Sequence, residues 1–205
     1  TDSDASTLTF LLFGGYGGST YGTAGPLEDT WIFTVDETTS SWAQLTPTQS
    51  PPTRYFYAMV PLILNSVTGG NKRYSGAGLM GGTNGSYPLN DFWVFTTETN
   101  EWLYVDLGEF EPRWGHSAVV YNGDVYIFGG QNGTQFFDDV WHFSLTDGTW
   151  KRVYNGGSTG PSARIMHSAA SASGGFIVFG GVLSNGTASN DLWLFDVGSS
   201  KWTDL

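Results

Sequence analysis

The composition of this chain of 205 residues excludes several classes of protein before any motif is considered. With 29 glycines, 16% aromatic residues and only 13% charged residues, it lacks the low hydrophobicity and dense charge of a disordered chain. A formal net charge of −11 argues against nucleic acid and anionic membranes as partners. The sequence has no cysteine, which excludes disulfides and thiol catalysis, and no apolar run of about 18 residues to span a bilayer.

One pattern of glycine, aspartate and tryptophan occurs four times along the chain. A glycine pair is followed by an aspartate that stands two residues before a tryptophan, and a second tryptophan comes later. The copies are Gly14-Gly15 with Asp29, Trp31 and Trp42; Gly81-Gly82 with Asp91, Trp93 and Trp102; Gly129-Gly130 with Asp139, Trp141 and Trp150; and Gly180-Gly181 with Asp191, Trp193 and Trp202. A unit that recurs about every 50 residues is typical of a β-propeller, in which each repeat folds as one blade.

Within each repeat the alternation of side chains predicts β-strands. In the first repeat, residues 7–13 lead into the glycine pair, and the next strand places Trp31, Phe33 and Val35 on one face. Because Ile32 between them is also apolar, we expect this strand to be covered on both faces, as in sheets stacked around an axis. The later repeats follow the same order and end in a short strand at the second tryptophan. Glycine at a strand end permits a positive φ and a close approach of the backbone.

A further segment recurs before each of the last three glycine pairs. It begins at a proline and contains an arginine, and it spans residues 52–57, 112–118 and 161–169. Together with the glycine pairs and spaced tryptophans, these segments resemble kelch repeats over nearly the whole chain. The resemblance implies an all-β fold, a β-propeller of four-stranded antiparallel kelch blades. The single kelch-type domain would have blades at approximately residues 7–46, 52–106, 112–154 and 161–205.

The first blade is predicted to be incomplete, because no first-strand segment precedes Gly14. Kelch proteins generally close with five to seven blades. About four blades are therefore expected to be part of a larger ring, or of a ring that another chain completes. An open sheet edge would leave unpaired backbone groups that can pair with another strand.

Loops between the second and third strands should share one rim with the connections between blades, because the strands are antiparallel. Both sets are long and polar. The loops are residues 16–28, 83–90, 131–138 and 182–190, and the connections are residues 46–53, 107–112 and 154–162. Loops on a rigid scaffold commonly carry binding function, and the kelch resemblance implies that partner peptides bind on this rim.

Three of these loops contain an N-glycosylation acceptor pattern, at Asn84, Asn132 and Asn185. Asn-Gly is also a favoured turn dipeptide, so the pattern by itself admits a structural explanation. The equivalent, exposed positions of the three patterns favour glycosylation, which would place the chain outside the cell.

Arg54, Arg113 and Arg164 recur in register and are candidate binding residues. An inward ring of arginines could bind carboxylates through forked hydrogen bonds, and the resemblance implies that some kelch domains bind acidic peptides in this way. A hydrogen bond repeated in each blade, for example to the aspartate before the tryptophan, would produce the same recurrence. This structural explanation is the favoured one.

His142 is a further candidate, because it occupies the position of Ile32, Val94 and Leu194 in the other blades. A histidine titrates near neutral pH and can act as an acid, a base or a metal ligand. Without a matched carboxylate or histidine, a packed and hydrogen-bonded role is favoured. No metal or other cofactor is predicted.

Some kelch propellers are enzymes, and the copper radical oxidases among them need a tyrosine cross-linked to a cysteine. This chain cannot form that cofactor, because it has no cysteine. No catalytic residue is predicted, and a carboxylate-based isomerase or hydrolase stays open as the less favoured alternative.

The sequence therefore predicts a non-catalytic protein-interaction or assembly module of a secreted or cell-surface glycoprotein. It would bind a protein or peptide partner through the loops of one rim. Further blades or another protomer and N-linked glycans are also expected partners, whereas nucleic acid and membrane insertion are not. A cytosolic kelch adaptor that recruits peptides is the alternative.

Overall fold

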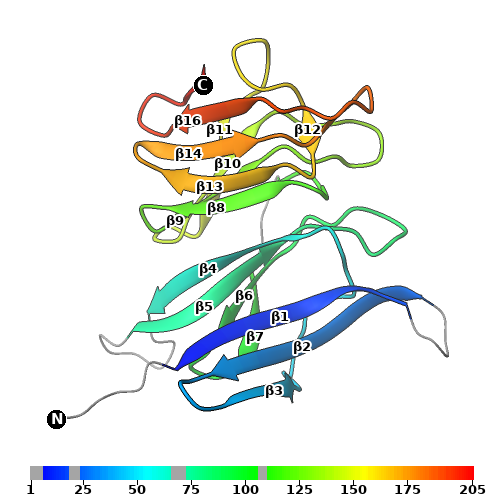
Figure 1. The fold of residues 1–205 in the computed structure, drawn as a ribbon, viewed down its shortest axis with the longest axis vertical. Helices are drawn as coiled ribbons and strands as arrows, with labels where there is room; N and C mark the ends of the chain where they lie inside the picture. The colour runs from blue at the N-terminus through cyan, green and yellow to red at the C-terminus, as the bar shows by residue number, and fades with distance from the viewer. Residues whose placement is uncertain (1–6, 19–23, 66–72, 106–109) are drawn as a thin grey trace.

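The computed structural model describes residues 7–18, 24–65, 73–105 and 110–205. These residues contain seventeen β-strands, joined by loops and turns, and no helix. All but two short strands form four antiparallel sheets that follow one another along the chain and lie side by side (Figure 1). We call these sheets blades 1 to 4. A search of the described residues finds no helix long and apolar enough to cross a membrane.

Blade 1 has three strands, whereas blades 2 to 4 have four each. The strands of blade 1 are β1 (Leu8–Gly17), β2 (Gly25–Val35) and β3 (Ser40–Leu45); those of blade 2 are β4 (Ala58–Asn65), β5 (Arg73–Met80), β6 (Phe92–Thr96) and β7 (Glu101–Val105). Blade 3 contains β8 (Ser117–Tyr121), β9 (Asp124–Phe128), β10 (Val140–Ser144) and β11 (Thr149–Tyr154). Blade 4 contains β13 (Ser168–Ala172), β14 (Gly175–Phe179), β16 (Leu192–Asp196) and β17 (Lys201–Asp204). The remaining strands, β12 (Arg164–Ile165) and β15 (Val182–Leu183), pair with each other where the chain enters blade 4.

The predicted burial of both strand faces is confirmed where a sheet has a neighbour on each side, as in blade 2, whereas one face of blade 1 is exposed at Leu12 and Trp42. On β6, Phe92 and Val94 belong to a buried cluster shared with Phe143 of blade 3. Phe95, on the opposite face of the same strand, packs in a cluster with Phe13 of blade 1. The hydrophobic core is therefore distributed over the interfaces between sheets.

The second tryptophan of a blade packs against the preceding blade. The ring of Trp102 lies 5.4 Å from that of Phe13, and its Nε1 donates a hydrogen bond of 3.1 Å to Oγ1 of Thr30 in blade 1. The ring of Trp202 lies 4.9 Å from that of Phe128 in blade 3. The spaced tryptophans of the sequence are thus contacts between blades.

In blades 2 and 3 the first glycine of the pair is needed where the blade meets the next one. Gly81 has a φ of 58°, and a Cβ at this position would lie 2.6 Å from the carbonyl oxygen of Arg113 in blade 3. Gly129 has a φ of 69° and makes the same approach to Arg164 in blade 4, at 2.8 Å. The positive φ and the close approach of the backbone, which were the two predicted reasons for glycine, are both present at these positions. The predicted all-β fold of antiparallel blades is confirmed.

Candidate protein-binding rim

Loops and interblade connections meet on one rim of the molecule, as the antiparallel topology requires. Tyr55, where the chain enters blade 2, forms a β-bridge with Thr83, which forms another with Pro88 across the loop between β5 and β6. Trp114 and Gln131 repeat the first of these bridges in blade 3. The segments that enter the blades are thus fastened to the loops beside them.

We call this surface the loop rim. It comprises the described residues 16–18, 24–28, 46–53, 83–90, 110–112, 131–138, 154–162 and 182–190, together with the entry segments 54–57, 113–116 and 164–167. Residues 19–23 of the predicted loop 16–28 and residues 107–109 of the predicted connection 107–112 lie outside the described part of the chain.

Each arginine of the entry segments is buried and forms a forked ion pair with the aspartate of its own blade. In blade 3, Nη1 of Arg113 donates to Oδ1 of Asp139 at 2.7 Å, and Nη2 donates to Oδ2 at 3.2 Å. Nη1 also donates to the carbonyl oxygen of Gly129 at 3.0 Å, and Nε donates to that of Glu111 at 3.3 Å. Trp141 adds a hydrogen bond of 2.7 Å from Nε1 to Asp139.

The same pairs join Arg54 to Asp91 and Arg164 to Asp191. The hydrogen bond from Arg164 is the main cause that holds the pKa of Asp191 well below its ordinary value. All three arginine side chains are 0% exposed. They therefore offer no surface to a carboxylate ligand, and the hydrogen bond to the aspartate explains their recurrence.

The residue three positions after each arginine lies between two blades. The hydroxyl of Tyr57 donates to the carbonyl oxygen of Phe13 in blade 1. His116 and His167 are its equivalents in blades 3 and 4, and burial lowers their pKa values to about 3 and about 4. Nε2 of His167 lies 2.8 Å from Oγ of Ser117 in blade 3. Both histidines are uncharged near neutral pH and serve the packing between blades.

Four aromatic rings form a continuous row over the entry segments of blades 2 and 3. The ring centroids of Tyr16 and Tyr55 are 5.1 Å apart, those of Tyr55 and Phe56 are 4.8 Å apart, and those of Phe56 and Trp114 are 5.4 Å apart. We call these four residues the aromatic row. Sequence reasoning used the entry segments only for their repeat pattern and missed this row. Its rings come from three segments that only the docking of the blades brings together.

The three acceptor asparagines lie at turns of the loop rim. The side-chain oxygens of Asn84, Asn132 and Asn185 each accept a hydrogen bond of 3.0 Å from the backbone N–H two residues later. This is the local turn that the Asn-Gly dipeptide favours. The side-chain nitrogen, to which a glycan would be attached, takes part in none of these bonds, so the turn is compatible with glycosylation.

His142 lies within blade 3, on β10, away from the loop rim. Its Nε2 is 2.9 Å from Oδ2 of Asp124, and its ring stacks on Tyr126 with 4.7 Å between centroids. The other oxygen of Asp124 accepts the backbone N–H of Leu145 at 3.0 Å. The pair ties β10 to β9. In the part of the chain that the structure describes, no group of three or more His, Asp or Glu is placed to hold a metal ion.

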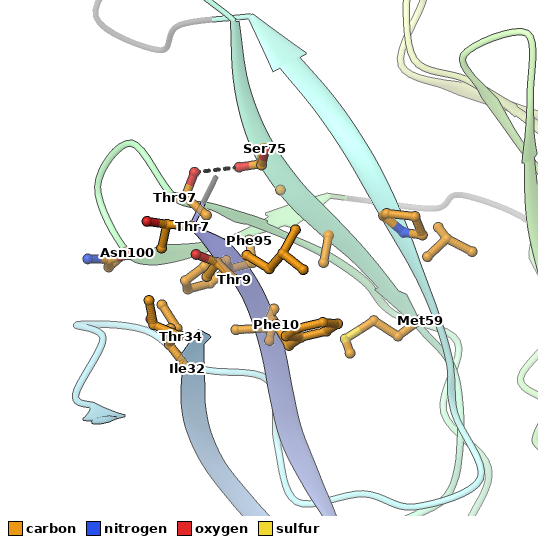
Figure 2. Close-up of a pocket in the computed structure, with 16 residues that line it drawn as sticks. Thr7, Thr9, Phe10, Ile32, Thr34, Met59, Ser75, Phe95, Thr97 and Asn100 are labelled. Carbon is orange, nitrogen blue, oxygen red and sulfur yellow. Dashed lines mark hydrogen bonds between the residues drawn. The ribbon is translucent and has the colours of Figure 1, made fainter. Parts of the chain in front are cut away.

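A cavity of about 740 Å³ lies between blades 1 and 2 (Figure 2). Phe10 and Met59 line it from opposite blades, and Oγ1 of Thr97 donates to the carbonyl oxygen of Ser75 at its wall. None of the described lining residues is acidic, basic, histidine or tyrosine. The cavity therefore has no side chain suited to general acid–base catalysis.

Residues 156–160, Gly-Gly-Ser-Thr-Gly, have the Gly-x-Ser-x-Gly spacing of a hydrolase nucleophile, which sequence reasoning overlooked. They lie in the connection between β11 and β12. The hydrolase motif requires a sharp turn from a strand into a helix, and the described residues contain no helix. The spacing does not indicate a hydrolase here.

Antiparallel sheets that stack through shared cores and repeat the same arginine–aspartate pair define a protein of the β-propeller class. The family model described as the KLHDC2/KLHL20/DRC7 Kelch-repeats domain matches residues 66–205. The chain belongs to the kelch-repeat family, as its sequence pattern predicted. Proteins of this family are generally protein-interaction modules.

Several curated proteins are similar to this chain. Kelch domain-containing protein 3 from Bos taurus is 32% identical over 183 residues, which cover 84% of this chain and 44% of the relative. Leucine-zipper-like transcriptional regulator 1 homolog from Drosophila melanogaster is 33% identical over 133 residues, or 58% of this chain and 13% of the relative. The flagellar outer-arm dynein alpha chain of Chlamydomonas reinhardtii is 30% identical over 167 residues, or 78% of this chain and 4% of the relative. The chain thus spans less than half the length of each of these relatives.

Proposed function

We propose that this chain is a non-catalytic protein-interaction module that binds a protein or peptide partner through its loop rim. Membership of the kelch-repeat family supports the interaction role. The aromatic row supports the choice of surface, because Tyr16 and Phe56 are exposed there on a rigid scaffold. Aromatic side chains provide large contact areas at low entropic cost and are enriched where binding energy is concentrated.

The buried ion pairs support this proposal by holding the entry segments in place. Arg54 lies directly before Tyr55 and Phe56, and Arg113 lies directly before Trp114. Each arginine is bonded to its aspartate and to backbone carbonyl groups of its own blade. A surface held in this way loses little conformational entropy when a partner binds.

A selection of random peptides on the immobilised chain tests the surface. Hydrogen exchange of the chain with and without a selected peptide should show protection in residues 83–90 and 131–138 of the loop rim. The hairpin turns of the opposite rim, at residues 97–100 and 145–148, are the internal control. A selection that yields no peptide, or protection confined to these turns, would contradict the proposed function.

We further propose that the module belongs to a secreted or cell-surface glycoprotein. The support is the equivalent position of Asn84, Asn132 and Asn185 on the loop rim. Intact mass should fall on enzymatic removal of N-glycans from the natively sourced protein. Thr134→Ala should abolish glycan mass at Asn132 while leaving the backbone bond that forms its turn, which makes it a better control than removal of the asparagine. An unchanged mass would favour the alternative, a cytosolic adaptor that recruits peptides.

The absence of catalysis is part of the same proposal. It is supported by the family's general role and by the uncharged lining of the cavity between blades 1 and 2. A turnover that is lost in His142→Ala, with the fold intact by circular dichroism, would overturn it.

A further inference from the structure

Two large apolar residues on the loop rim hold a backbone conformation that favours glycine. Phe56 has a φ of 56° and Met166 a φ of 55°, and the equivalent residue of blade 3 is Gly115, with a φ of 68°. For a bulky residue this left-handed region is strained, whereas glycine adopts it freely. The other described non-glycine residues with positive φ are Asn100, Asn122 and Ser200, all at hairpin turns of the opposite rim.

The three left-handed residues are neighbours along the loop rim. The N–H of Gly115 donates to the carbonyl oxygen of Phe56 at 2.9 Å, and the N–H of Met166 donates to that of Gly115 at 2.8 Å. The fold therefore requires this backbone conformation in three blades, and glycine satisfies it in one of them. Phe56 is 45% exposed and Met166 is 50% exposed, so neither side chain is needed to fill the core. Strain at an exposed apolar side chain points to binding as the reason for the side chain.

The charge of the loop rim limits the chemistry of a partner. The described residues of its loops and connections include three carboxylates and no lysine or arginine; the acidic residues are Glu28, Glu111 and Asp138. The arginines of its entry segments are fully buried in ion pairs with aspartate. An acidic peptide would find no available cation on this surface, whereas lysine and arginine side chains are attracted both by carboxylates and by the faces of aromatic rings.

We propose that the aromatic row and Met166 together recognise an extended peptide segment that carries large apolar side chains and lysine or arginine. This inference rests on the proposed function and specifies its surface and its ligand. The row of four rings matches about five residues of extended chain, at roughly 3.3 Å per residue. Apolar side chains of the peptide bury against Phe56, Trp114 and Met166, and its cations lie over the rings and near the rim carboxylates.

The test uses the random peptides selected on the complete chain. Their sequences are expected to be enriched in aromatic, aliphatic and basic residues and depleted of Asp and Glu. Phe56→Gly and Met166→Gly should each weaken binding of a selected peptide on the order of tenfold or more, as truncation of a central contact residue does. Neither change should lower the melting temperature, because relief of the left-handed backbone strain offsets both the packing of a half-exposed side chain and the greater entropy of glycine in the unfolded chain.

Asn100→Gly is the matched control, because it places glycine at a left-handed position on the opposite rim. It should leave peptide binding unchanged. Phe56→Asn and Met166→Asn provide a second pair if the glycine variants unfold, since asparagine tolerates the left-handed region without supplying an apolar surface.

The outcomes separate this inference from the function on which it rests. Selected peptides rich in Asp and Glu, or peptides whose affinity survives Phe56→Gly and Met166→Gly, would overturn the inference while leaving a protein-binding rim. A selection that yields no peptide would overturn both. Basic and apolar peptides that lose affinity only in the Phe56 and Met166 variants would establish it.

Discussion

Blade 1 and blade 2 carry the same apolar positions, but among the described residues blade 2 has a neighbouring sheet on both sides and blade 1 on one. Trp42 of blade 1 is 56% exposed, whereas Trp102, its equivalent in blade 2, is 1% exposed because it packs against blade 1. Leu12 is exposed on β1, whereas the equivalent Leu79 on β5 is fully buried. Burial in this fold is therefore decided by the neighbouring sheet, and the pattern within one sheet only makes it possible.

Blade 4, at the other end of the described chain, exposes the second residue of this contact between blades. Phe179 of blade 4 occupies the position of Phe13 and Phe128, which are buried against the tryptophans of the blades that follow them. Phe179 itself is 53% exposed. The exposed Trp42 and Phe179 are thus the two members of one contact that recurs between successive blades.

Polar contacts differ between the blades in the same way. Asp29 of blade 1 accepts a hydrogen bond of 2.6 Å from Trp31, as the equivalent Asp139 does from Trp141. Asp139 is also bound by a buried arginine, and within the described residues no arginine pairs with Asp29. Four comparisons of equivalent residues, in order of expected effect, test how much each neighbour contributes.

The largest difference in lost stability is expected between variants of the two aspartates. Asp139→Asn should lower the free energy of unfolding by roughly 3–5 kcal/mol, because it leaves the buried guanidinium of Arg113 without a compensating charge. Asp29→Asn should cost less than about 1 kcal/mol, as changes away from such pairs usually do. Urea unfolding of both variants measures the difference, and equal losses would contradict the structural role of the pair.

Replacement of Trp102 and of Trp42 should lower the free energy of unfolding by amounts that differ nearly as much. Trp102→Ala removes a buried ring and should cost about 3–5 kcal/mol. Trp42→Ala removes an exposed one and should cost about 1 kcal/mol or less. If Trp102→Ala does not fold, Trp102→Phe and Trp42→Phe give the same comparison at smaller amplitude. A large loss from Trp42→Ala would mean that another surface covers this face in solution.

Acid should weaken the interfaces of blade 3 with blades 2 and 4 and spare that between blades 1 and 2. His116 and His167 have folded pKa values of about 3 and about 4, below the ordinary 6.5, so protons bind the unfolded chain first. The stability present above pH 6.5 is then lost as the pH falls toward 4, on the order of 2 kcal/mol per histidine at pH 5. Tyr57, whose pKa burial raises, has the opposite sign and loses stability only above about pH 10.

Melting temperature against pH measures this effect. His116→Tyr and His167→Tyr install the residue that blade 2 uses at the same position, and they should flatten the curve between pH 6.5 and 4. The stabilisation from Asp191, whose pKa is lowered in the folded chain, is present above about pH 3.8 and is lost only as the pH falls below that value, so it does not obscure that window. An unchanged slope in both variants would show that the histidines are not the cause.

The smallest difference in lost stability is expected between variants of two glycines that have nearly the same φ. Gly129 and Gly180 have φ values of 69° and 68°, so alanine strains both equally. A Cβ at Gly129 would also lie 2.8 Å from the carbonyl oxygen of Arg164, whereas a Cβ at Gly180 would come no closer than 3.3 Å, to Ser189. Gly129→Ala should therefore cost about 1–3 kcal/mol more than Gly180→Ala in thermal or urea unfolding. A difference near zero would show that the blades separate easily at this contact.

Much of the fold could be predicted from the sequence, because each blade is a local unit. Alternation around Trp31 and the position of Gly81 report on one strand and one turn, and both can be read from neighbouring residues. The acidic partner of Arg113 could also be foreseen, since both residues recur in register. The aromatic row could not, because Tyr16, Tyr55 and Trp114 are far apart in the sequence and become neighbours only when blades dock.

By itself the sequence determined the strands, the blades and their family, since these depend on side-chain periodicity and on repeated local turns. Tertiary structure alone decided which equivalent residues are buried. It enclosed Arg54, Arg113 and Arg164, left Trp42 and Phe179 exposed, and assembled an aromatic surface beside Phe56 and Met166. The physical reason is that a β-blade buries neither face on its own, so exposure and surface chemistry arise only where one sheet meets, or does not meet, the next.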